Sequence, residues 1–290
     1  MVQPINKRRM VQLNYHSDEW INNKVFEHLE EAQTILSESH IVGIFLQGSQ
    51  NYGLDYENSD IDTKCITTPT FEEIALARKP LSTTHIRAND EHIDLKDIRL
   101  YVQTFRKQNL NFLEILFTPY YFLNDKYKEQ WNRLVENKEA ITHYDMVRSV
   151  KSMMGIASEK YFAMEHEYPS RMAWIEKFGY DPKQLHHLLR VSEYLDRYLK
   201  GESFEDCLKT KEAEYLKEVK KGFYSLEKAR DLATSVYEEI HTKCNIFIEK
   251  HKNERPVAWV DALFDDVAYE IMKISVKNDF KREENKNGMV

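Results

Sequence analysis

The stretch that decides the fold is IVGIFLQGSQNYGLDYENSDID, at residues 41–62. Its first part, residues 41–46, is a short β-branched and aromatic run, which is typical of a buried strand. The run stops at Gly48, a residue that often ends a strand in a turn. A second strand is predicted over residues 60–66, because apolar and polar side chains alternate there.

Further elements follow on both sides of this stretch. Apolar residues recur every three or four positions before it, which predicts an amphipathic helix with Ser17 or Asp18 as its cap. After it we expect a short helix, a third strand, and a helix that Asp97 caps. The predicted ranges are 18–39 for the first helix, 71–78 for the short helix, 91–95 for the strand and 97–106 for the last helix. Together these elements form a small α/β unit over about the first 120 residues.

From about residue 125 onward the pattern is helical. The charged tail, residues 277–290, has few apolar residues, so we expect it to fray. The predicted helices are 145–165, 182–200, 212–221 and 226–249, and Gly201 suits a position just after a helix end. The fold class is therefore α+β, with a small mixed-sheet core over residues 1–124 followed by an all-helical domain over residues 125–290.

Composition excludes several classes of protein. The 290 residues are 42% hydrophobic and 31% charged, with a net charge of −7, which excludes a disordered or collagen-like chain. Glycine and proline number only 8 and 7, and such a scarcity of helix breakers predicts long helices. The acidic balance argues against non-specific nucleic-acid binding, although a local basic face remains compatible with it.

Cysteine usage and hydropathy bear on the compartment. The three cysteines are far apart in sequence and show neither disulfide nor zinc spacing. No apolar run approaches the roughly 20 residues of a membrane helix, and no apolar segment follows the basic residues near the first position. We therefore expect a cytoplasmic protein without a membrane partner.

The loop between the first two strands suggests phosphate and metal chemistry. Gly48 lets the backbone approach a ligand, and the Ser49 hydroxyl with nearby N–H groups forms an anion cradle. Asp60 and Asp62 lie two apart, so they share one side of a strand. Such carboxylates repel each other unless a cation lies between them, and Mg²⁺ prefers oxygen ligands and phosphates. The alternative is an ordinary turn followed by a solvated strand edge.

The pattern Gly48-Ser49, Tyr52-Gly53-Leu54 and Ser59-Asp60-Ile61-Asp62 resembles the nucleotidyltransferase superfamily that includes DNA polymerase β. The resemblance implies a nucleoside triphosphate held at Gly48, Ser49, Tyr52 and Ser59. It also implies two Mg²⁺ or Mn²⁺ ions bound by three carboxylates. The third carboxylate belongs on a later strand, where Asp94 is the candidate, Glu91 an outside candidate, and Asp97 more typical of a helix cap.

A closer resemblance is to the predicted nucleotidyltransferases associated with RNA ligases. Residues 109–117, NLNFLEILF, are similar to a segment of that branch, with Leu110 where proline is expected. Residues 180–190 match its Tyr-Asp-x-Lys…His…Arg helix, with Asp181 suited to the N-cap and Pro182 to the first turn.

The basic residues of that helix are Lys183, His187 and Arg190, which share one helix face because they lie at i, i+4 and i+7. They suit a triphosphate or a polynucleotide backbone, and the resemblance favours that role over a solvated or salt-bridged surface. Glu114 is interpreted as a buried partner of a basic residue such as Arg190. The Lys/Glu-rich run 209–221 is interpreted as a solvated face.

The function expected from these features is metal-dependent transfer of a nucleoside monophosphate from a nucleoside triphosphate to a hydroxyl, with release of pyrophosphate. Asp60, Asp62 and Asp94 are the expected metal ligands and catalytic carboxylates. An RNA end, a protein side chain or a small molecule is the expected acceptor. Two alternatives stay open: a non-catalytic, antitoxin-like interaction protein that keeps the fold, and a phosphate-binding hydrolase.

Overall fold

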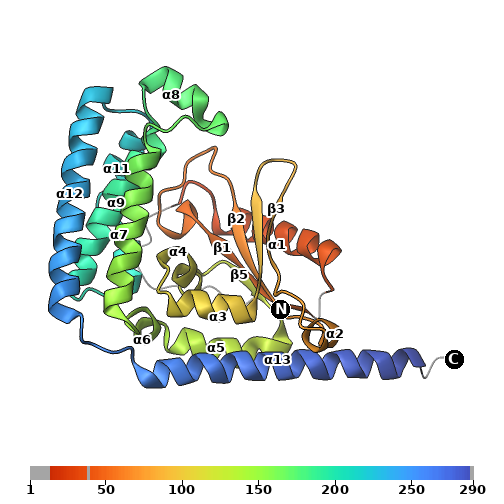
Figure 1. The fold of residues 1–290 in the computed structure, drawn as a ribbon. Helices are drawn as coiled ribbons and strands as arrows, with labels where there is room; N and C mark the ends of the chain where they lie inside the picture. The colour runs from red at the N-terminus through yellow and green to blue at the C-terminus, as the bar shows by residue number, and fades with distance from the viewer. Residues whose placement is uncertain (1–13, 38–39, 288–290) are drawn as a thin grey trace.

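The computed structural model describes residues 14–37 and 40–287, and combines one sheet with many helices (Figure 1). Its sheet has the strand order β3-β4-β2-β1-β5. The strands are β1 (Ile41–Gln47), β2 (Asp62–Thr67), β3 (Ser82–Ile86), β4 (His92–Asp97) and β5 (Tyr121–Leu123). Strands β2 and β4 are parallel and the other neighbours are antiparallel, so the sheet is mixed as the sequence predicts.

Helices pack on both faces of the sheet and extend beyond it (Figure 1). Those of the first half are α1 (Asp18–Ile35), α2 (Phe71–Ala75), α3 (Ile98–Arg106), α4 (Leu110–Leu113), α5 (Lys128–Glu136) and α6 (Lys138–Thr142). Those of the second half are α7 (Met146–Ala163), α8 (Met172–Phe178), α9 (Pro182–Leu199), α10 (Phe204–Leu208), α11 (Ala213–Lys220), α12 (Leu226–His251) and α13 (Ala258–Asn287). The α+β class predicted from the sequence is confirmed.

The two faces of the sheet are covered differently because side chains alternate along each strand. One face packs on α1, where Val25 meets Ile44 and Cys65 in one buried cluster. The opposite face holds Phe45 and Ile66, and its apolar cluster continues through α3 and α4 into the helical half. Even-numbered residues of β2 and β4 lie on this second face, so the polar residues of interest lie opposite α1.

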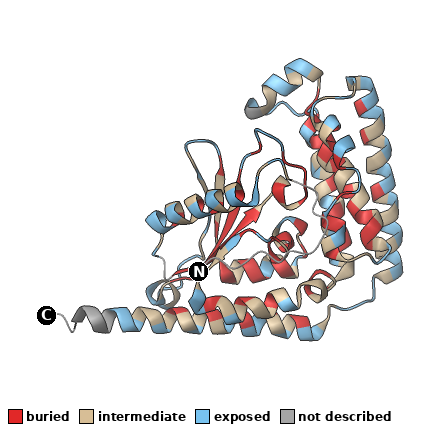
Figure 2. Cartoon of the chain, turned by 180° about the vertical axis from the view of Figure 1, so that it is seen from behind, coloured by how far each residue is buried: buried red, intermediate tan, exposed pale blue. Residues whose placement is uncertain are grey.

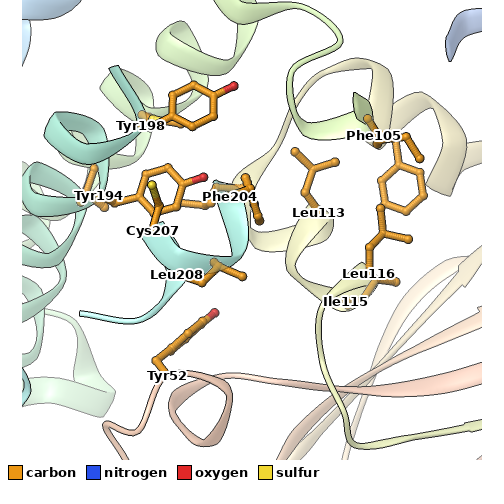
Figure 3. Packing of buried hydrophobic residues seen from close by; sticks show 14 of the residues in the cluster. Tyr52, Phe105, Leu113, Ile115, Leu116, Tyr194, Tyr198, Phe204, Cys207 and Leu208 are labelled. Atoms are coloured by element: carbon orange, nitrogen blue, oxygen red, sulfur yellow. The ribbon is translucent and has the colours of Figure 1, made fainter. Parts of the chain in front are cut away.

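The helical half contacts the sheet unit through a shared core. In Figure 2 the buried residues concentrate in the sheet and on the helices beside it. Figure 3 shows Tyr52, from the loop after β1, in the same cluster as Tyr194 of α9 and Leu208 of α10. The boundary expected at residues 124/125 therefore lies within a continuous core, and the division into two domains stays a prediction.

Local start and stop signals are confirmed by the caps. The side chain of Ser17 accepts a hydrogen bond from the N–H of Trp20, and that of Asp97 from the N–H of Arg99. Asp181 caps α9, with Pro182 in its first turn. Gly201, with φ +81°, follows the end of α9 as expected.

Strands β3 and β5 are not among the strands that the sequence predicts. Helices α8 and α13 lie in the half predicted to be helical, although the sequence analysis gives no range for either. The predicted fraying of residues 277–290 is wrong as far as Asn287, because α13 continues to that residue. Its last turns pack on the sheet unit: Asp279 pairs with His40 at 3.1 Å, and Arg282 donates to the Ser37 hydroxyl at 2.7 Å. Residues 288–290 lie outside the described part.

The predicted helix 18–39 ends earlier, at Ile35. Its predicted last two residues, 38–39, lie outside the described part of the chain. Across residues 14–37 and 40–287, no helix combines the length and apolar character that a bilayer crossing requires.

Candidate active site

The loop after β1 bends sharply beside the start of β2. The last residue of β1, Gln47, is the Cα partner of Asp62, so the bend at Gly48 adjoins the carboxylate segment. Gly48 has φ +111° and ψ −158°, a region open essentially to glycine alone. A 3₁₀ turn over Ser49–Asn51 follows, in which Tyr52 N–H donates to the Ser49 carbonyl at 3.1 Å.

Two buried side chains hold the backbone of the carboxylate segment. Gln50 donates from Nε2 to the Asp60 carbonyl at 2.8 Å, which ties the bend directly to that residue. Glu91 accepts the N–H of Ile61 at 3.4 Å. Glu91 is therefore occupied as a support: burial raises its pKa, but hydrogen bonds from His28 and Asn89 outweigh that effect and lower the pKa to about 2.

Asp60 and Asp62 lie close enough for the negative charge of one to act on the other. Burial and the charge of Asp60 raise the pKa of Asp62, against the opposing effect of His92. His92 is the neighbour of Asp62 on β4: its N–H donates to Asp62 Oδ1 at 3.0 Å, and its Nδ1 lies 3.1 Å from the same oxygen. Two neighbouring carboxylates suit a hard divalent cation, which prefers oxygen ligands.

Asp94 lies on the strand next to β2, two residues beyond His92, the neighbour of Asp62. Its Cα partner in β2 is Lys64, and the Lys64 Nζ lies 3.4 Å from Asp94 Oδ2. In the described ranges 14–37 and 40–287, no group of three or more His, Cys, Asp or Glu side chains is arranged to hold a metal ion. The expected third ligand is thus engaged in an ion pair one step further along the strands.

Glu114, Arg190 and the bend form a buried constellation. Glu114 accepts a hydrogen bond from the N–H of Gly48 and is close enough to Arg190 for its positive charge to act on it. Both interactions lower the pKa of Glu114, but burial has the larger effect and raises the pKa to about 8. The guanidinium carbon of Arg190 lies 3.5 Å from the centroid of the Tyr52 ring. The burial expected for Glu114 is confirmed, and the positive charge of Arg190 acts on it, but no ion pair or hydrogen bond joins the two side chains. The Gly48 N–H is occupied within the protein.

The other predicted residues of the loop and of α9 have distinct environments. Ser59 caps a turn, because its hydroxyl accepts the N–H of Tyr56 at 2.9 Å. Lys183 is exposed near the first turn of α9. Burial lowers the pKa of His187 well below its usual value, and the positive charges of Arg190 and Lys183 act in the same direction, so this imidazole is neutral.

Lys220 is a residue of the site that sequence reasoning missed. Its ammonium lies 4.3 Å from the centroid of the Tyr56 ring. Burial and Lys183 lower its pKa to about 8, while Asp60 and Asp55 act in the opposite direction. The interpretation of run 209–221 as a wholly solvated face is therefore wrong at this residue. In sequence Lys220 is one of many charges, and only the packing of α11 distinguishes it.

A scan against protein-family models finds no model that matches this chain, and a search of the curated proteins finds no match either.

Proposed function

We propose that the chain is a metal-dependent nucleotidyltransferase, which moves a nucleoside monophosphate from a nucleoside triphosphate to a hydroxyl acceptor. The observation that carries the proposal is the adjacency of the Gly48 bend and the Asp60/Asp62 pair. Gln47 pairs with Asp62, and Gln50 bonds to Asp60, so the two halves of the motif are linked through the backbone. If residues 48–53 formed only an ordinary turn and Asp60 and Asp62 only a solvated strand edge, no side-chain bond between the two segments would be needed.

The residues that would hold a divalent ion are Asp60 and Asp62, because two neighbouring carboxylates repel each other and favour a cation between them. A divalent ion bound there supplies positive charge for the triphosphate and acidifies a hydroxyl. The first N–H groups of the 3₁₀ turn have no partner within it and are suited to a phosphate oxygen. With the Gly48 N–H occupied, Ser49 and its turn carry the phosphate contacts.

The reaction is an in-line displacement at the α-phosphorus. The acceptor oxygen forms a bond to phosphorus as the bond to the β-phosphate oxygen breaks, and the hydroxyl proton passes to a carboxylate or to water. Lys220 lies close enough to Asp60 and to Lys183 for their charges to act on it, and positive charge there favours the leaving pyrophosphate. Arg190, through its contact with Tyr52, is a positioning residue.

An RNA end and a protein side chain both stay candidate acceptors. Labelling decides between them: the chain is incubated with each α-³²P nucleoside triphosphate, Mg²⁺ or Mn²⁺, and total RNA or total protein. We expect label in one acceptor class, and none when Asp60→Ala and Asp62→Ala are combined. Asp231→Ala, an exposed change on α12, is the matched control. Full incorporation by the double variant would contradict the proposal.

A second candidate function is a non-catalytic interaction protein with the same fold. The engagement of Asp94 by Lys64 favours it, because a nucleotidyltransferase of the resembled type uses three carboxylates. Calorimetry with ATP or GTP and Mg²⁺ separates the two candidates. Binding that the Asp60/Asp62 double variant abolishes supports the enzyme, whereas the absence of binding at millimolar nucleotide supports the interaction protein. Release of nucleoside diphosphate or monophosphate without labelling would instead indicate a hydrolase.

A further inference from the structure

The register between the parallel strands β2 and β4 determines which side chains lie close enough to bind the same ion. Residues opposite each other on β2 and β4 lie side by side, and a shift of two residues adds about 6.6 Å along the strand. Opposite Asp62 lies His92, which already bonds to it. Asp94 lies opposite Lys64, two residues further on. With a strand spacing near 4.8 Å, the diagonal from Asp62 to Asp94 is about 8 Å.

Lys64 is a buried lysine beside Asp94, the expected third carboxylate. Its side chain is 5% exposed, and its ammonium lies 4.1 Å from the centroid of the Phe112 ring. Lys96 contacts the same ring at 4.0 Å. A buried ammonium requires a partner of opposite charge. The carboxylate that serves Lys64 is Asp94, at 3.4 Å, and the charge of Asp62 adds to the attraction.

In this arrangement Asp94 already has a partner of opposite charge, the Lys64 ammonium. A divalent cation bound to Asp94 would lie close to the buried Lys64 ammonium, and the two positive charges would repel each other. Lys64 lies on the same face of β2 as Asp62, since the two residues are spaced by two within the strand. The positive charge of Lys64 therefore lies beside Asp62 on this face of the strand.

We propose that Lys64 supplies the second positive charge of this site, so that the chain binds one divalent ion, on Asp60 and Asp62, where the resemblance implies two. The inference rests on the proposed function, because it concerns the number of metal ions that the proposed nucleotidyltransferase site binds. Asp94 is then a positioning residue that keeps the Lys64 ammonium in place beside Asp62.

The test counts bound Mn²⁺ by electron paramagnetic resonance, in the presence of a non-hydrolysable ATP analogue. We expect one Mn²⁺ per wild-type chain, with affinity weakened at least about tenfold in Asp62→Asn. Asp94→Asn keeps Lys64 and should leave the count at one. Lys64→Met frees Asp94 and should raise the count to two, whereas Lys96→Met, which removes the other ammonium on the Phe112 ring, should not.

The outcomes separate the two proposals. Two ions in the wild type, falling to one in Asp94→Asn, would overturn the one-ion inference and leave the nucleotidyltransferase intact. No ion at any nucleotide concentration would overturn both. If Lys64→Met does not fold, the comparison of wild type with Asp94→Asn decides alone, because the one-ion and two-ion sites predict different changes for that variant.

Discussion

Glu114 offers the sharpest test of how the bend is held. The carboxyl is buried, with 2% of its surface exposed, and its pKa is raised from 4.5 to about 8. A raised pKa means that the folded chain holds the proton more tightly than the unfolded chain. Between these two values the unfolded state binds fewer protons, so the free energy of unfolding falls as pH rises.

The magnitude follows from the shift. Each pKa unit corresponds to about 1.4 kcal/mol, so a shift of about 3.5 units sets an upper limit of ~5 kcal/mol. Glu114→Gln replaces the carboxyl with a group that does not titrate. Relative to this variant, the wild type should therefore lose a few kcal/mol of stability between pH 5 and pH 9.

The assay is urea unfolding followed by circular dichroism at several pH values, with the variant's free energy subtracted from that of the wild type at each pH. This subtraction removes the titration of all other groups. Glu129→Gln, an exposed change on α5, should give a flat difference. A flat difference for Glu114→Gln as well would refute the reasoning. A wild type that instead gains stability with pH would show that Arg190 holds Glu114 ionised.

Three further changes probe the support of the site and of the last helix by the same unfolding measurement. Gly48→Ala should lower the free energy of unfolding by about 1–3 kcal/mol. The cause is backbone strain at φ +111° and not a clash, since the nearest atom to a new Cβ lies at 3.7 Å. Gly155→Ala, in open space within α7, should instead raise it by about 0.5–1 kcal/mol, and equal effects of the two changes would contradict the strain at Gly48. Arg190→Met should cost about 2–4 kcal/mol through loss of the Tyr52 stack and of the charge beside the buried carboxyl; an unchanged midpoint would mean that α9 does not support the bend. Asp279→Ala removes the partner of a buried histidine and the acceptor for an α2 N–H, at about 1–3 kcal/mol, and limited proteolysis should then cut the end of α13 sooner than in the wild type.

Sequence reasoning succeeded where the cause of structure is local. The alternation over residues 60–66 predicted β2, because a strand's period of two is independent of its neighbours. The strand begins at Asp62, so Asp60 lies just before it and the prediction that both carboxylates share one side of the strand is not met there. The caps at Asp97 and Asp181 were predicted because each side chain bonds to an N–H only two residues away. The bend at Gly48 was signalled by glycine directly after a buried run.

What the sequence could not decide is the partner across each strand and helix. Asp94 lies on the expected strand, but the register between β4 and β2 places it opposite Lys64, whereas His92 lies beside Asp62. Lys220 reaches Tyr56 only because α11 packs beside α9. Periodicity fixes the face on which a residue lies. Register and docking depend on contacts between segments far apart in the chain, whose energies no local pattern contains.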